Sequence, residues 1–152
     1  MPVGAHDRVA AATVVRKLAT PSTERTTMDE HPNAKILRDL ADRMNAGDME
    51  AAFGVLSDDV EWHEIGRSEP TRGKQALGQR YAESVGDFEV EAKLHDVVAG
   101  DAHAVQLMDV TARRGGKTLD YRTAEIYHMK DGKITARWAF SGDTAAIVEF
   151  FG

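Results

Sequence analysis

The side chains available for chemistry in this 152-residue chain are carboxylates, imidazoles, phenols and guanidinium groups. Cysteine is absent, which excludes thiolate nucleophiles, disulfides and cysteine-ligated metal centres. The six histidines form no HExxH motif and no other paired spacing, so we expect neither a metal site nor a cofactor. No GxSxG sequence is present to hold a serine nucleophile. Gly116-Lys117-Thr118 resembles the end of a phosphate-binding loop, but Thr111 stands where that motif requires glycine.

Composition and charge limit the classes of molecule that this protein is expected to bind. The chain has 42% hydrophobic and 29% charged residues, as a single globular domain does, and no stretch approaches the roughly 18 apolar residues of a membrane helix. A net charge of −6 argues against binding to a phosphate backbone, which needs a concentrated positive face. We therefore expect a cytoplasmic protein with a small-molecule or protein partner, and neither nucleic acid nor membrane.

The N-terminal stretch differs from the rest of the chain. Residues 1–27 carry four basic and two acidic residues, contain much Ala, Thr and Val, and end near the turn-prone Thr20-Pro21-Ser22-Thr23. We interpret residues 1–30 as a flexible extension and residues 31–152 as the folded domain. The extension is either native, a targeting segment, or upstream of a start at Met28.

Hydrophobic periodicity predicts helices and one strand in the first half of the domain. Leu37, Leu40, Ala41 and Met44 have the spacing of an amphipathic helix. The run around Trp62 alternates residue by residue and is rich in strand formers. The predicted elements are a helix from Pro32 to Gly47, a short helix from Asp48 to Leu56, a strand over 59–65, a loop over 69–73, and a helix marked by Leu77, Tyr81 and Val85.

The second half reads almost entirely as strand. Predicted strands cover 88–95, 102–112, 118–129 and 133–141. Turn residues join them at Gly100-Asp101, at Arg114-Gly115-Gly116-Lys117 and at Lys130-Asp131-Gly132-Lys133. Asp143 then caps a short final helix. This order predicts an α+β fold in which helices pack on one face of a curved, antiparallel sheet.

Several short segments resemble the bacterial ketosteroid isomerases. They are Asn45-Ala46-Gly47-Asp48, Ser57-Asp58-Asp59, Ser68-Glu69-Pro70 with Gly73, Tyr81-Ala82, and the hairpin Asp131-Gly132-Lys133-Ile134, and the resemblance covers roughly residues 33–143. More broadly the chain is similar to the nuclear transport factor 2-like superfamily, which includes SnoaL-like polyketide cyclases and limonene epoxide hydrolases. The resemblance implies a cone-shaped, cystatin-like α+β domain, usually dimeric, with a ligand cavity between the helices and the concave sheet face.

The resemblance also assigns candidate roles. The aspartate base of the isomerases falls on Glu64, which keeps the carboxylate. The tyrosine and the protonated acid that stabilise the oxyanion fall on Leu40 and Ala124, so both donors are replaced. Because one oxyanion donor contributes about 3–4 kcal/mol to lowering the barrier, efficient steroid isomerisation is not expected.

Strand alternation, taken from an inward-facing Glu64, selects further cavity residues. The candidate substrate-binding residues are Trp62, Tyr81, Gln106, Met108, Arg122, His128 and Arg137. The opposite sheet face would carry Tyr127, Trp138 and Phe140, an apolar surface that predicts a homodimer. A bulge in one strand would invert this assignment and place Tyr127 and Trp138 in the pocket.

Two interpretations of Glu64 remain open at this stage. As a base it would serve an isomerase, cyclase, dehydratase or hydrolase acting on a moderately polar substrate. Paired with Arg122 or Arg137 it would be structural, because such pairing lowers the pKa of a carboxyl group. The alternative function is a non-catalytic ligand-binding or dimerisation domain of the same fold, and a further alternative is water activation of the epoxide-hydrolase type.

Overall fold

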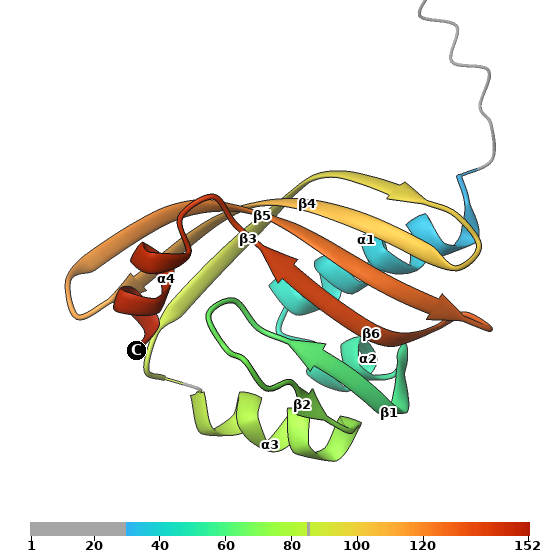
Figure 1. Cartoon of the computed structure of the whole chain (residues 1–152), viewed down its shortest axis with the longest axis horizontal. Helices are drawn as coiled ribbons and strands as arrows, with labels where there is room; N and C mark the ends of the chain where they lie inside the picture. The colour runs from blue at the N-terminus through green and yellow to red at the C-terminus, as the bar shows by residue number, and fades with distance from the viewer. Residues whose placement is uncertain (1–29, 85) are drawn as a thin grey trace, which may run out of the picture.

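The structure, a computed structural model, describes residues 30–84 and 86–152 (Figure 1). The predicted extension lies outside the described residues except for Glu30. The helices are α1 (Pro32–Asn45), α2 (Met49–Phe53), α3 (Lys74–Ser84) and α4 (Thr144–Phe151). The strands are β1 (Leu56–His63), β2 (Thr71–Arg72), β3 (Glu89–Ala99), β4 (His103–Arg114), β5 (Lys117–Lys130) and β6 (Lys133–Phe140).

The six strands form one curved, open sheet in the order β2-β1-β6-β5-β4-β3. Strands β3 to β6 make an antiparallel meander, and β1 then pairs in parallel with β6. Helix α1 crosses the face of the sheet that carries the core, and α3 lies beside β1 and β2 (Figure 1). The predicted α+β class with helices packed on a curved, mixed sheet is confirmed. No helix within the described residues is long and apolar enough to cross a membrane.

Local sequence explains where α1 begins. Pro32 occupies the first turn, where its missing N–H has no partner to lose. The ring Nδ1 of His31 accepts the backbone N–H of Asn33 at 3.1 Å, and its Nε2 lies 3.0 Å from Asp101 at the β3–β4 turn. The cap therefore fixes both the start of the helix and its position against the sheet.

Pairing with the distant strand β6 shifts the first strand from its predicted position. The second helix ends at Phe53 rather than Leu56, because Leu56 pairs with Ile134 and the Ile134 N–H donates to the carbonyl of Val55. Strand β1 correspondingly covers 56–63 rather than 59–65. Glu64 consequently lies just beyond the strand.

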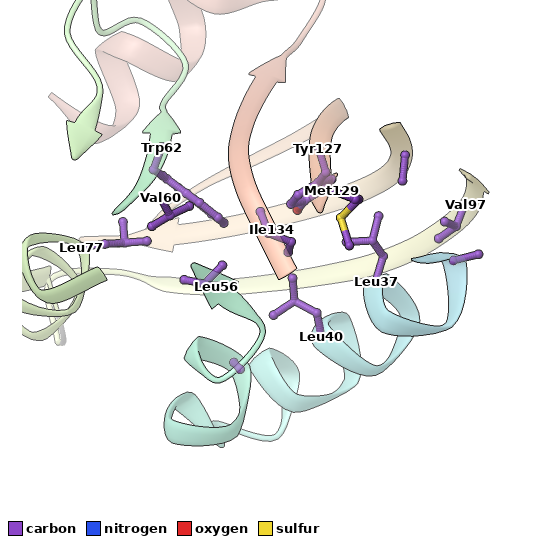
Figure 2. Packing of buried hydrophobic residues seen from close by; sticks show 13 residues of the cluster. Leu37, Leu40, Leu56, Val60, Trp62, Leu77, Val97, Tyr127, Met129 and Ile134 are labelled. Carbon is purple, nitrogen blue, oxygen red and sulfur yellow. The ribbon is translucent and has the colours of Figure 1, made fainter. Parts of the chain in front are cut away.

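The core lies between α1 and one face of the sheet, which we call the inner face. Leu37 and Leu40 of α1 point toward Ile134, Met129 and Tyr127 of the strands (Figure 2). Leu40, the position of the isomerase tyrosine, is thus a core residue. Fully burying a side chain of this size contributes about 1.5–3 kcal/mol.

The turn between β4 and β5 decides which residues of β5 face the core. Arg114 pairs with Lys117 across two glycines, so even-numbered residues of β4 face odd-numbered residues of β5. Directly paired residues lie on the same face of a sheet. Buried Gln106 and Met108 therefore share the inner face with Glu125 and Thr123.

The predicted orientation of β5 is therefore wrong for its whole length. Arg122, Ala124 and His128 lie on the outer face, whereas Tyr127 is buried on the inner face. The prediction placed the even-numbered residues of both β4 and β5 on the inner face. The two-residue turn instead pairs even-numbered residues of β4 with odd-numbered residues of β5. Ala124, the position of the protonated acid in the isomerases, faces away from the core. The residues on either side of it, Thr123 and Glu125, face the core.

A register shift in the β5–β6 pair brings Arg137 to the inner face. Met129 pairs with Ile134, but two residues earlier on β5 Tyr127 pairs with Arg137, so β6 has one additional residue between these pairs. Such a bulge reverses the side-chain phase along a strand. Arg137 therefore lies inward and Trp138 outward, as predicted.

Candidate functional site

Five polar side chains meet on the inner face, beneath α1, and we call them the inner polar cluster. They are Gln106, Thr123, Glu125, Tyr127 and Arg137. Arg137 Nη2 lies 3.0 Å from Glu125 Oε1, and the Tyr127 hydroxyl lies 2.7 Å from Glu125 Oε2 and 2.9 Å from Gln106 Oε1. Gln106 Nε2 in turn donates to the Leu37 carbonyl of α1 at 3.2 Å. The cluster thus links three strands to the helix above them.

The charges of the inner polar cluster are fixed by one another. Burial alone would raise the pKa of Glu125, but Arg137 and the hydrogen bonds from Tyr127, Arg137 and Thr123 outweigh it and lower the pKa. Burial would lower the pKa of Arg137, yet the facing charge of Glu125 raises it. The pKa of Tyr127 is raised well above its usual value by burial and by Glu125. At neutral pH the cluster therefore holds a carboxylate, a guanidinium and a neutral phenol.

Arg137 has an N–H group that makes no hydrogen bond among the described residues. Its Nη1 donates to the His63 carbonyl at 3.2 Å, and its guanidinium carbon lies 4.6 Å from the centre of the Trp62 ring. Its Nε is buried and has no hydrogen-bond partner among the described residues. A buried N–H without a partner costs about 1–3 kcal/mol and calls for an explanation such as a bound water or a ligand.

A second ion pair stands at the end of β1. Arg80 of α3 donates from Nε and Nη2 to the two carboxylate oxygens of Glu64, at 2.7 and 2.6 Å. Arg67 Nε lies 3.5 Å from the same carboxylate, whose side chain is 28% exposed. Glu64 is therefore paired as the structural interpretation required, but with Arg80 rather than Arg122 or Arg137.

Tyr81 stands within electrostatic reach of both ion pairs. Burial raises the pKa of its hydroxyl, the charges of Glu125 and Glu64 also raise it, and those of Arg137 and Arg80 lower it. Its ring packs edge-on against Phe53 at 5.7 Å between centroids. At neutral pH the Tyr81 hydroxyl is therefore protonated.

Among the described residues, a small cavity lies on the inner side of the sheet and a larger groove lies on its outer side. A small apolar cavity of about 10 Å³ on the inner side is lined by Leu40, Met44, Met49, Ala52, Phe53, Leu56, Trp62 and Tyr81. A larger groove of about 450 Å³ on the outer side, which we call the outer groove, includes Leu107, Asp109, Arg122, Ala124, Phe140 and Ser141 in its lining. Glu64 lines neither of them.

The structure brings together most, but not all, of the residues selected from the sequence. Gln106 and Arg137 belong to the inner polar cluster, and Met108 lies on the same face. Trp62 contacts Arg137, Glu64 follows the His63 carbonyl to which Arg137 donates, and the charges of Glu125 and Arg137 act on Tyr81. The two exceptions belong to β5. Arg122 pairs on the outer face with Asp109 at 2.8 Å, and His128 packs against Trp138 at 4.6 Å between ring centroids.

Sequence reasoning missed three functional candidates. Tyr127 was assigned to the wrong face and Glu125 was not selected at all. Only the odd phase of β5, set by the Gly115-Gly116 turn, would have revealed them. Arg80 was missed because nothing in the helical pattern of α3 distinguishes an arginine that reaches the end of β1 from one in solvent.

Comparison with known proteins agrees with this architecture. The sequence profile of the SnoaL-like domain matches residues 37–137. Bal32a, from a soil-derived mobile gene cassette, is 26% identical, with 80% of this chain and 97% of that chain covered at a TM-score of 0.73. Comparison with curated proteins finds no significant match in sequence.

Two more distant solved structures have described activities or ligands. TerC, co-crystallised with polyporic acid, is 18% identical, with 78% of this chain and 97% of TerC covered at a TM-score of 0.69. An LEH-like epoxide hydrolase of M. tuberculosis is 17% identical, with 72% and 82% covered at 0.65. Others of this shape are described as nuclear transport factor 2-like or cystatin-like.

These likenesses concern the fold, whereas the profile match concerns the sequence and spans about two thirds of it. A shared fold supports many chemistries, so the activity has to be argued from the site. The chain belongs to the SnoaL-like domain family.

Proposed function

We propose that this protein is a small-molecule enzyme that performs carboxylate acid–base chemistry at the inner face, as an isomerase, cyclase, dehydratase or hydrolase. The observation that carries the proposal is that Arg137 donates to the carbonyl of His63, the residue next to the partly exposed carboxylate Glu64, and that the charges of both groups act on the Tyr81 phenol. A family of small-molecule catalytic or binding domains, with polyketide cyclase-like and epoxide hydrolase-like neighbours, supports it.

The three groups have separate roles in this proposal. Glu64 accepts the proton, because its carboxylate is reachable and retains unshared lone pairs after accepting two N–H groups from Arg80. Tyr81 and Arg137 donate hydrogen bonds to the oxygen on which negative charge develops. The bidentate contact with Arg80 keeps the carboxylate in one orientation, which limits the loss of rate from a misplaced base.

A reaction that needs no knowledge of the natural substrate tests the base. Small ketones and esters would be incubated with the protein in deuterated buffer, and exchange of the protons next to the carbonyl would be followed by NMR. We expect Glu64→Gln to reduce the protein-dependent exchange rate by about 10²–10⁴-fold. The matched control is Glu61→Gln, since Glu61 is a glutamate of β1, just before Glu64, that also pairs with an arginine, Arg72. Equal exchange by Glu64→Gln and the wild type would remove Glu64 as the base.

The alternative is a binding protein without catalysis. The observation that favours it is that both carboxylates of the site, Glu64 and Glu125, are held by arginines, and such pairing makes a carboxylate a weaker base. In that case ligands would stabilise the protein in thermal-shift assays, and neither the wild type nor Glu64→Gln would accelerate proton exchange.

We also propose that two copies associate through the outer sheet face. Trp138 lies on that face, and Phe140 is 54% exposed beside the outer groove, an arrangement in which an apolar surface remains uncovered. Tyr127, predicted for the same interface, is excluded because it is buried on the inner face. Light scattering should give a dimer for the wild type and a monomer for Phe140→Asp. The control is Val148→Asp on α4, and a monomeric wild type contradicts the proposal.

A further inference from the structure

The inner-face site is closed among the described residues. Gln106, Thr123 and Tyr127 are buried, and the side chains of Glu125 and Arg137 are only 14% and 13% exposed. The small cavity on this side of the sheet, at about 10 Å³, has room for roughly one water. A substrate therefore reaches the site only when an element that covers the inner face moves.

Helix α4 contacts the loop that carries Glu64. Figure 1 shows α4 beside the β4–β5 hairpin, apart from the other three helices. Its Val148 lies against Gly66, two residues beyond Glu64, so that a Cβ added to Gly66 would lie 3.6 Å from Val148 Cβ. One side of α4 is thus placed next to the proposed base.

The end of α4 reaches the other side of the same site. The ring of Phe151 meets the ring of Tyr121 on β5 edge-on, with 6.3 Å between their centroids. Burial and the charge of Glu125 raise the pKa of Tyr121, and the charge of Arg137 lowers it, so Tyr121 stands within electrostatic reach of the inner polar cluster. Helix α4 therefore spans the site from the Glu64 loop to the edge of the cluster.

Few contacts hold α4 in this position. Ile147 is its one buried residue, whereas α1 buries five. Arg114 of β4 donates from Nη1 to the carbonyls of Phe150 and Phe151, at 3.2 Å each. Within residues 30–84 and 86–152, no ion pair joins α4 to another element. Elements held in this way open at a lower free energy than the core does.

Movement of α4 would leave the polar contacts of the site intact. Glu64 is paired with Arg80 of α3, and Gln106 donates to the Leu37 carbonyl of α1. Displacement of α3 or α1 would break one of these contacts, whereas displacement of α4 breaks neither. Residues 141–143 join β6 to α4, and a Cβ added at Gly142 would meet nothing within 4 Å, so this connection has open space in which to turn.

We infer that α4 is a lid of the inner-face site, which lifts from Gly66 and Tyr121 to admit a substrate and closes over it. This inference rests on the proposed function, because it names the element that controls access to that same site. Closure of such a lid excludes water from the reacting groups, and its hinge is a short segment at the end of an element.

Thiol labelling tests the lid directly, because the chain has no cysteine of its own. Val110→Cys places a thiol on the inner face beside the lid, since Val110 is buried and pairs directly with Tyr121. Ala104→Cys is the matched control on the same strand, because Ala104 is buried in the core that contains Leu37. Each full-length variant would be reacted with N-ethylmaleimide under native conditions and followed by mass spectrometry. We expect Val110→Cys to react at least about 30-fold faster than Ala104→Cys.

A disulfide between α4 and the Glu64 loop would hold the lid closed. The 3.6 Å separation at Gly66 and Val148 lies within the roughly 3.5–4.5 Å between the Cβ atoms of a disulfide. Oxidised Gly66→Cys/Val148→Cys, combined with Val110→Cys, should label at position 110 at least about 10-fold more slowly. The control is Gly66→Ser/Val148→Ser in the same background, which has the same left-handed backbone without a crosslink. Circular dichroism checks that both variants are folded.

Arg114→Gln tests the lid without a crosslink. It removes both hydrogen bonds to the last carbonyls of α4, so Val110→Cys should label about 10-fold faster while Ala104→Cys is unchanged. The matched control is Arg113→Gln, because Arg113 is the neighbouring arginine of β4 and lies 3.8 Å from Glu89. The inference is overturned if Val110→Cys reacts as slowly as Ala104→Cys, or if neither the disulfide nor Arg114→Gln changes its labelling.

Proton exchange separates the lid from the proposed function. Oxidised Gly66→Cys/Val148→Cys should exchange the protons of small ketones at least about 10-fold more slowly than the wild type and should recover after reduction. Full exchange by the oxidised variant would show that substrate reaches the site without movement of α4, and the lid would be refuted. A wild type without exchange would refute the proposed catalysis, and the labelling rates would then decide the lid by themselves.

Discussion

Removal of one member of the Glu125–Arg137 pair should destabilise the protein far more than removal of both. The two charged atoms lie 3.0 Å apart, and the side chains are only 14% and 13% exposed. At an effective dielectric constant of about 20, their attraction is about 5 kcal/mol before the cost of desolvating both groups is subtracted. The substitutions Arg137→Gln and Glu125→Gln, alone and combined, measure what remains.

Each single substitution leaves a buried charge without its partner, for which about 3–5 kcal/mol is the usual loss of unfolding free energy. The double variant has no such charge, so we expect it to lose at least about 2 kcal/mol less than the sum of the two single losses. The assay is urea denaturation followed by far-UV circular dichroism, with the free energy of unfolding extrapolated to zero urea.

The exposed Asp109–Arg122 pair supplies a matched control for this cycle. Its atoms lie 2.8 Å apart, closer than those of the buried pair, but the Arg122 side chain is 88% exposed. Solvent screening should therefore limit its coupling to about 1 kcal/mol or less. If the losses at Glu125 and Arg137 simply add, to within about 0.5 kcal/mol, the two groups do not stabilise each other and the electrostatic account of the cluster is wrong.

Three further outcomes are expected. The pKa of Glu125 is lower in the folded protein than in the unfolded chain, so the Glu125 carboxylate contributes fully to stability above the unfolded pKa. That contribution is lost as the pH falls through the pKa of the folded state. Below about pH 4.5 the wild type should therefore lose stability more steeply than Glu125→Gln in thermal denaturation. Gly47→Ala should lose about 1–2 kcal/mol, the cost of placing a side chain on a left-handed backbone in open space. Gly66→Ala should lose more, because Gly66 has a similar φ and its added Cβ would lie 2.2 Å from Val148 Cγ2. Equal losses in urea denaturation would contradict this reasoning. His31→Ala should lose about 0.5–2 kcal/mol with the helix cap, and His31→Asn should recover most of it; no difference between these two variants would show that the cap is unimportant.

Local patterns were sufficient to predict the helices and the longer strands of this fold. The two-residue strand β2 lies within the predicted loop over 69–73, because it forms only by pairing with β1. The spacing of Leu37, Leu40 and Ala41 marks the buried stripe of α1, and these residues are buried in the structure. The Asp131-Gly132 turn joins β5 to β6 with positive φ at both residues, the backbone that this dipeptide favours. Such signals depend on neighbours in sequence and can therefore be recognised without a tertiary structure.

The candidate site could be predicted only in part. Trp62 and Tyr81 could be selected as candidates, because one lies on a strongly alternating strand and the other in a helix packed beside it. The partner of Glu64 could not be predicted, since Arg80 follows it by 16 positions and reaches it only through the packing of α3 against β1. Ion pairs of this kind depend on distance in space.

The sequence by itself determined the order of the helices and of the longer strands, the absence of thiol chemistry, and the carboxylate that follows the first strand. Tertiary structure decided which side chains share the inner face. Alternation along a strand is a local property, but its phase depends on cross-strand pairing. The two-residue Gly115-Gly116 turn places Glu125 and Tyr127 inward, and the bulge in β6 turns Arg137 to meet them.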